Sequence, residues 1–396
     1  MKKVLSNRLR FDVRKNLLTQ TLEEKRRTGE RILDLTCSNP TICGFQYPES
    51  NLLQALSNPK AMIYEPHPAG LPEAREVVAS IYRRRGAEVS PRDFFLTAST
   101  SEAYSFLFKL LADSGDEVLI PRPGYPLFED LASLEGLRVR YYSLEYHGRW
   151  WVDLQGLRGA ITPRSRALVV INPNNPTGSF LSEAEWRHIQ QFSTEAGLAI
   201  ICDEVFFDYP ILTGDRESPF DLLPEWQAGP AFFLGGLSKF AGLPQMKLSW
   251  ILLRGPQPVC EELREGLELV ADAYLSVGAL VQHSLKEIVG FSGGVRDQIR
   301  QRVAGNYRWL ESSVQGSAID LFPAEGGWYT VLQLPRVMDD EKWCVLFLKD
   351  SNVLVHPGYL FGFVQEGMVV VSLLPEAEVF RVGISRLLNC VDRAVQ

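Results

Sequence analysis

The feature that most constrains this chain is an alternation of short apolar, β-rich runs with helical segments between residues 94 and 254. Seven such runs are present, at residues 94–98, 117–121, 138–144, 167–172, 199–205, 231–237 and 248–254. The runs ALVVIN and AIICDEV are nearly continuous in apolar residues, which is typical of strands buried on both faces of a parallel sheet. Strands that alternate with helices predict a doubly wound α/β sheet with right-handed crossovers. We therefore expect a large, mostly parallel, seven-stranded sheet domain.

Helix start and stop signals lie between the expected strands. In LSEAEWRHIQQFSTEAG, Ser182 is the expected N-cap, Glu185 holds the capping-box position and Gly197 ends the helix. A long helical section follows at about 259–315, and residues 318–396 mix short strands with helices. We expect three parts: an N-terminal arm that joins part of a smaller domain at 1–45, the large domain at 46–285, and a small α+β domain at 286–396.

Composition and charge exclude several classes of protein. The 396 residues include 41 Lys and Arg against 48 Asp and Glu, and the net charge of −7 argues against a nucleic-acid partner. The six cysteines form no CxxC pair and the five histidines show no metal-ligand spacing, so we expect neither a disulfide framework nor a metal site. No apolar run of about 18 residues is present, so we expect no membrane span. The basic N-terminus lacks the apolar core of a secretory signal, so we expect a cytoplasmic protein.

Polar residues follow five of the expected strands, at the edge where ligands bind in such sheets. They lie in the stretches TASTSEA, PRPGYP, NPNNPTG, DEVFFDY and LSK. Packing alone does not explain hydroxyl, phenol, amide, carboxylate and amine groups at one edge. The motifs GxGxxG, GxxxxGK[ST] and GxSxG are absent, which argues against dinucleotide, P-loop and serine-hydrolase chemistry.

This set of groups suits pyridoxal 5'-phosphate. Lys239, among small and apolar neighbours in GGLSKFAGLP, is the candidate amine for the aldehyde of the cofactor, because burial disfavours the ammonium form. Asp203 would keep the ring nitrogen protonated, and Asn175 would donate to the phenolic oxygen. Tyr125 would stack on the ring, and the helix start STSEA would bind the phosphate. Each residue alone is more often exposed or purely structural, so the interpretation depends on the combination.

In order and spacing, INPNNPTG, CDEV and LSKFAGLP resemble the motifs of the class I/II aminotransferases, which are fold type I pyridoxal-phosphate-dependent enzymes. The resemblance runs from about residue 30 to about residue 390. It implies a homodimer with its sites at the interface, which moves an amino group between an L-amino acid and a 2-oxo acid through an imine on the catalytic Lys239. It also implies a set of cofactor-binding residues: Tyr64, Ser99, Thr100, Ser101, Tyr125, Asn175, Asp203, Phe206, Ser238, Lys239 and Lys247.

The resemblance assigns particular tasks to three of the polar side chains. Tyr64 would reach the phosphate of the neighbouring subunit. Asn175 and Arg381 would contact the substrate, with the Arg381 guanidinium binding the α-carboxylate as a bidentate fork.

Three positions depart from the family pattern. The family usually has Arg eight residues after the lysine, Ser or Thr three before it, and Tyr three after the aspartate; this chain has Lys247, Gly236 and Phe206 there. The same scaffold serves lyases and decarboxylases, which stay alternatives to transamination, and a non-catalytic binding protein is a third.

The stretch LVADAYLSVGALVQHSL bears on the substrate. Relatives that act on aspartate carry a second arginine there, whereas this chain has no Arg or Lys before Lys286. A side-chain carboxylate would be desolvated without a partner, so we expect a neutral side chain, apolar or aromatic.

Overall fold

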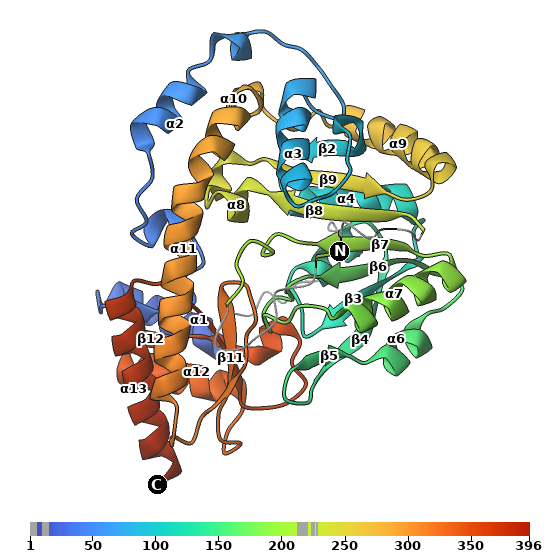
Figure 1. Ribbon diagram of the computed structural model, residues 1–396. Coiled ribbons are helices and arrows are strands. Elements are labelled where there is room, and N and C mark those ends of the chain that lie inside the picture. Colours follow the sequence, from blue (N-terminus) through green and yellow to red (C-terminus); the bar gives the residue numbers. More distant parts are fainter. Residues whose placement is uncertain (1–5, 10–15, 212–220, 223–225, 227–228) are drawn as a thin grey trace, which may run out of the picture.

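The computed structural model describes residues 6–9, 16–211, 221–222, 226 and 229–396 (Figure 1). Residues 1–5 and 10–15 of the expected N-terminal arm lie outside the described residues.

The main sheet has eight strands in the order β2-β9-β8-β7-β6-β3-β4-β5. Their bounds are β2 (Phe94–Thr97), β3 (Glu117–Arg122), β4 (Arg138–Tyr146), β5 (Trp150–Val152), β6 (Ser165–Ile171), β7 (Ala199–Asp203), β8 (Ala231–Gly236) and β9 (Ser249–Arg254).

The predicted α/β fold class is confirmed, with one strand more than expected. The strands β8, β7, β6, β3 and β4 are parallel to one another, and β9 lies antiparallel between β2 and β8. All seven expected strands are present. The eighth, β5, is a three-residue strand that pairs antiparallel with the end of β4. A strand this short carries too few residues for a periodic signal, which is why the sequence did not predict it.

Helices cover both faces of the main sheet. Along β6, Leu168 and Val170 pack into one core cluster, whereas Val169 and Ile171 pack into another, as the two-residue period of a strand requires. The first cluster includes residues of α3 and α7, and the second includes residues of α4, α5 and α9. Helices of this domain and its surroundings are α2 (Glu49–Leu56), α3 (Pro72–Arg84), α4 (Thr100–Leu111), α5 (Phe128–Leu134), α6 (Leu154–Ala160), α7 (Glu183–Ala196), α8 (Leu237–Phe240), α9 (Gln257–Asp272) and α10 (Ala279–His283).

The smaller domain is built on an antiparallel sheet with the order β10-β11-β14-β13. Its strands are β10 (Asp320–Phe322), β11 (Tyr329–Gln333), β13 (His356–Pro357) and β14 (Met368–Ser372), and β1 (Leu33–Asp34) pairs parallel with β12 (Val353–Leu354). Its helices are α1 (Leu17–Arg27), α11 (Leu285–Ser313), α12 (Asp340–Ser351) and α13 (Ala377–Val395). One core cluster joins Leu18 and Leu35 to Ile384 and Leu387, so the N-terminal segment packs with the C-terminal one. The domain limits at residues 45 and 285 stay a prediction.

The two domains meet at the carboxyl edge of the main sheet. The backbone of Pro210, after β7, forms a bridge with Gly326 of the smaller domain, and Gly124 N–H donates to the Phe361 carbonyl at 2.9 Å. The helix α11 runs along both domains (Figure 1). Within the described part of the chain, no helix is long and apolar enough to cross a membrane.

Candidate active site

Lys239 lies on α8, the single helical turn that follows β8 at the carboxyl edge of the sheet. Its side chain is half-buried, and its amine lies 5.2 Å from the ring centre of Phe206 and 4.7 Å from that of Trp328. Burial lowers the pKa of Lys239 to about 8, although the charge of Asp203 opposes this shift. The Tyr209 hydroxyl donates to the backbone carbonyl of Lys239 at 2.5 Å, which fixes the turn. An unprotonated, nucleophilic amine is thus available just above neutral pH.

Asp203 is a buried carboxylate at the end of β7. Its Oδ2 accepts a 3.0 Å hydrogen bond from the Tyr104 hydroxyl, and its Oδ1 accepts one of 3.1 Å from the Val205 N–H. Burial raises the pKa of Asp203 to about 6, while these two hydrogen bonds and the charge of Lys239 lower it. Both hydrogen-bond donors are neutral, so no cation among the described residues is hydrogen-bonded to this carboxylate.

Asn175 lies in the loop between β6 and α7, and its Oδ1 is buried. In the described part of the chain this oxygen has no hydrogen-bond partner. Buried polar atoms are nearly always hydrogen-bonded, so an orphaned amide oxygen here points to a group that the protein itself does not supply.

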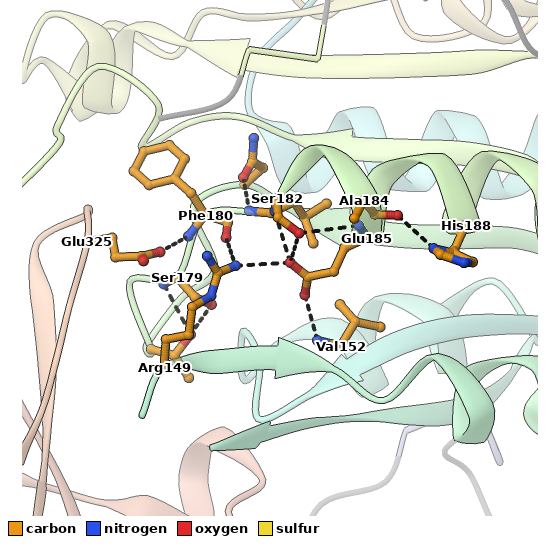
Figure 2. Close-up of polar contacts among 12 residues, drawn as sticks. Arg149, Val152, Ser179, Phe180, Ser182, Ala184, Glu185, His188 and Glu325 are labelled. Carbon is orange, nitrogen blue, oxygen red and sulfur yellow. Dashed lines mark hydrogen bonds and ion pairs between the residues drawn. The ribbon is translucent and has the colours of Figure 1, made fainter. Parts of the chain in front are cut away.

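Contacts on three sides hold the loop that carries Asn175 (Figure 2). The Phe180 N–H donates to Glu325 Oε2 of the smaller domain at 2.8 Å. The guanidinium of Arg149 donates to the Phe180 carbonyl at 3.2 Å and to Glu185 Oε2 at 3.0 Å. Glu185 also accepts from the Val152 N–H at 2.8 Å. Both domains thus bind the loop at Phe180, five residues after Asn175.

The N-terminus of α4 faces the same region. Ser99 is the N-cap and accepts from the Glu102 N–H at 3.1 Å, and the first N–H groups of a helix have no intrahelical partner. Burial raises the pKa of Tyr125, the charge of Asp203 raises it further, and a hydrogen bond with Ser101 lowers it. Tyr125 is therefore close to both Ser101 and Asp203. Thr100 and Ser101, at the positive end of a twelve-residue helix, suit an anion.

Of the other predicted site residues, some lie near Lys239 and others do not. Ser238 is half-buried beside Lys239 on α8. Phe206 is buried against Trp328 and offers no hydroxyl, and Tyr209 does not replace it, because its hydroxyl is bonded to the carbonyl of Lys239. Lys247 is exposed, with a left-handed φ of 49°.

Tyr64 is 79% exposed and lies in the loop between Ile63 and Pro68, with no contact to Lys239 of its own chain. It lines a cavity of about 220 Å³ together with residues 275–279. This position is compatible with its expected role toward a neighbouring subunit.

Arg381 is not brought to this site, which corrects its assignment as the ligand of the substrate carboxylate. It is exposed on α13, and its guanidinium lies 6.0 Å from the ring centre of Trp309 on α11. The buried face of α13 includes Phe380, Ile384 and Leu387, so position 381 falls outside that face. Figure 1 shows α13 at the outer edge of the smaller domain, away from α8.

Sequence reasoning missed three residues of the site. Tyr104 orients Asp203, Trp328 covers the amine of Lys239, and Tyr209 anchors its backbone. Tyr104 follows Ser101 by three positions on one helix face, a spacing that could have drawn attention to it. Trp328 comes from the smaller domain and carries no motif.

Comparison with known proteins shows the family to which this chain belongs. The chain matches the family described as Aminotransferase class I and II over residues 37–384. It belongs to the class I and II aminotransferase family. It is 28% identical over 389 residues to glutamate-pyruvate aminotransferase AlaA of Escherichia coli (strain K12), covering 95% of this chain and 94% of the relative. Tyrosine aminotransferase of Mus musculus is 30% identical over 277 residues, covering 69% of this chain and 60% of the relative.

Solved structures agree with this membership. The alanine aminotransferase from Pyrococcus furiosus superposes with a TM-score of 0.85 at 25% identity, covering 95% of this chain and 96% of that one. An aminotransferase from Escherichia coli gives a TM-score of 0.86 at 25% identity, with 98% of each chain covered. The predicted aminotransferase activity and the predicted dependence on pyridoxal 5'-phosphate are thereby confirmed.

The residues of this site fit that cofactor. It supplies, when bound, an aldehyde for an amine and a ring that withdraws electrons from the substrate. The structure offers a half-buried amine of low pKa, a buried carboxylate held by neutral donors, an amide with an orphaned oxygen and a helix N-terminus. Each of these groups answers one need of the cofactor: covalent attachment, charge at the ring nitrogen, a polar contact and phosphate binding.

Proposed function

We propose that Lys239 is the catalytic residue of this aminotransferase and that Asp203 supports it. The observation that carries the proposal is the placement of these two groups at the ends of the adjacent strands β7 and β8, where each charge shifts the pKa of the other. Lys239 would hold the cofactor between turnovers and, once free, move the proton taken from Cα of the substrate. The rings of Phe206 and Trp328 would keep water from its amine.

The remaining residues have binding roles. Asp203, oriented by Tyr104, would keep the ring nitrogen of the cofactor protonated. The Asn175 amide would contact the phenolic oxygen, the Tyr125 ring would cover one face, and Thr100 and Ser101 would bind the phosphate through backbone N–H groups.

We also propose that the substrate has a neutral side chain. The segment between Leu269 and Leu285 carries no Arg or Lys, and its residues 275–279 share a cavity with Tyr64. If this segment faces a partner's site together with Tyr64, it offers no cation to a side-chain carboxylate, whose desolvation would cost several kcal/mol. The relative named tyrosine aminotransferase agrees with this expectation, whereas the name of glutamate-pyruvate aminotransferase AlaA includes one substrate with a side-chain carboxylate.

The test is a panel of amino acids with pyruvate or 2-oxoglutarate as acceptor and identification of the products. Neutral amino acids are expected to show a kcat/KM at least tenfold above that of aspartate. The highest kcat/KM for aspartate would refute the substrate assignment, and release of carbon dioxide, ammonia or a thiol instead of a new amino acid would indicate decarboxylase or lyase chemistry.

A homodimer is proposed as the working form. Large apolar side chains lie exposed in the loop before α3 and on α10, among them Met62 (86%), Ile63 and Leu280. Such a contiguous face is unusual on a monomer. Joining two chains there would bury it and would place the exposed Tyr64 at a partner's site.

The dimer makes a prediction of its own. Ile63→Asp is expected to shift the particle from twice the 44.6 kDa chain mass to the mass of one chain in light scattering, and to lower activity with it. Val364→Asp, which changes an even more exposed residue of the smaller domain (81% against 61% for Ile63), is the matched control and is expected to change neither mass nor activity. A monomeric natural protein with full activity would contradict the proposal.

We further propose a cytoplasmic location. All six cysteines are free, and the thiols of Cys37 and Cys43 share a hydrogen bond of 3.6 Å rather than a disulfide. Unpaired neighbouring thiols fit a reducing compartment.

A further inference from the structure

A row of three residues crosses the carboxyl edge of the main sheet. Ser249, the first residue of β9, pairs with Thr97 at the end of β2 on one side and with Gly236 at the end of β8 on the other. Thr97 precedes Thr100, at the start of α4, by three residues, and Gly236 precedes Lys239 by three. Ser249 therefore lies between the helix N-terminus proposed for the phosphate and the turn that carries the amine.

The Ser249 side chain occupies space that a glycine leaves free. A Cβ atom on residue 236 would lie 2.2 Å from Ser249 Oγ and 2.9 Å from Ser249 Cβ. The backbone at Gly236 is extended, with φ 178°, so the backbone conformation itself does not require glycine there. The constraint comes from Ser249, chiefly from its side chain, because its Cα would lie 3.2 Å from the same Cβ atom. The space between residues 236 and 249 therefore holds only one side chain, here that of Ser249.

Ser249 is a nearly buried residue whose hydroxyl has no hydrogen-bond partner among the described residues. Ser249 is only 2% exposed, and no hydrogen bond between described residues uses its Oγ. The neighbouring hydroxyls already have partners: Thr97 donates to the Ser99 carbonyl at 3.1 Å, and Ser99 caps the Glu102 N–H. Ser249 Oγ is not among the fully buried polar atoms without a partner, so it keeps a small accessible surface through which a ligand can accept its hydrogen bond, whereas the Oγ of Ser193 on α7 is fully buried.

We propose that Ser249 donates a hydrogen bond to the phosphate of the cofactor, in place of a hydroxyl on residue 236. In the family pattern the hydroxyl stands at the position of Gly236 on β8. In this chain the hydroxyl is on Ser249 of the adjacent strand β9, and the missing side chain at Gly236 leaves space for it. Lys247 is exposed to solvent in this chain. The neutral hydrogen-bond donors proposed for the phosphate are therefore the Ser249 hydroxyl and the N–H groups at the start of α4. The inference depends on the proposed binding of the cofactor at Lys239.

The test compares the affinity of cofactor-free, full-length protein for pyridoxal 5'-phosphate and for pyridoxal, which lacks the phosphate. Ser249→Ala is expected to raise the Kd for pyridoxal 5'-phosphate by about 10- to 100-fold, the range for a hydrogen bond to a charged group, and to leave the Kd for pyridoxal unchanged. Ser193→Ala is the matched control, because Ser193 on α7 is also a buried serine whose Oγ has no partner among the described residues. It is expected to change neither affinity.

A strand swap provides a second readout. Gly236→Ser alone is expected to weaken binding through the clash with Ser249, whereas Gly236→Ser combined with Ser249→Gly is expected to recover most of the affinity for the phosphorylated form. An unchanged Kd for pyridoxal 5'-phosphate in Ser249→Ala, or an equal loss for both ligands, overturns the assignment. If the natural protein fails to attach the cofactor at Lys239, the proposed function fails instead, so the two failures are distinguishable.

Discussion

Lys239→Ala is expected to lower the rate of transamination by at least about 10²- to 10⁴-fold, the usual contribution of a positioned proton-transfer group alone. The loss of covalent attachment adds to this effect. The fold is expected to survive, because the amine makes ring contacts rather than hydrogen bonds among the described residues, and the backbone bond from Tyr209 to residue 239 does not need the side chain. Lys342→Ala, which removes an exposed lysine of the smaller domain, is the control and is expected to keep full activity.

Two measurements accompany this variant. Borohydride reduction of the natural protein followed by peptide mass spectrometry is expected to find the cofactor on Lys239, and a label on any other lysine means that the assignment is wrong. In cofactor-free protein, the reactivity of Lys239 toward an amine-specific reagent is expected to rise with pH and to be half-maximal near pH 8, since burial lowers its pKa and the neutral amine is the reactive form.

Asp203→Asn is expected to lower kcat/KM by roughly 10²- to 10⁴-fold. The amide keeps the shape of the side chain, its oxygen can still accept from the Val205 N–H and its NH2 can donate to the Tyr104 hydroxyl oxygen, but the negative charge is lost. Removing one charge of a buried pair costs about 3–5 kcal/mol, which corresponds to that range of rates. The charge of Asp203 raises the pKa of Lys239, so the variant is also expected to shift the labelling midpoint of Lys239 below pH 8.

Two comparison variants separate charge from structure. Tyr104→Phe leaves the carboxylate but removes one of its hydrogen bonds, so we expect a smaller loss, of about tenfold. Asp340→Asn changes a buried carboxylate of the smaller domain that accepts backbone N–H bonds, and is expected to lower the melting temperature without a change in the Lys239 midpoint. A normal rate in Asp203→Asn would remove Asp203 from the proposed site.

The order of the helices and strands, and most of the polar residues at the carboxyl edge of the main sheet, could be predicted from the sequence. Both predictions depend on local properties of the chain. Apolar runs such as 167–172 and 199–205 show burial on both faces directly, and in a parallel sheet the residues that follow such strands meet at one edge. Lys239, Asp203, Asn175 and Tyr125 were predicted in this way, and the structure places Lys239, Asp203 and Tyr125 close together, with the Asn175 loop at the same edge.

Tertiary structure alone decided the remaining features, because each depends on which distant segments come together. Arg381 was assigned from its local motif. In the structure it lies outside the buried face of α13, so its side chain is exposed. Trp328 approaches the amine of Lys239 only because the smaller domain packs on the carboxyl edge of the sheet. The pairing of Ser249 with Gly236 follows from the antiparallel register of β8 and β9, and no local pattern shows which side chain fills the space beside a glycine. Local periodicity determines the elements and their order, whereas side-chain direction and register are determined by packing.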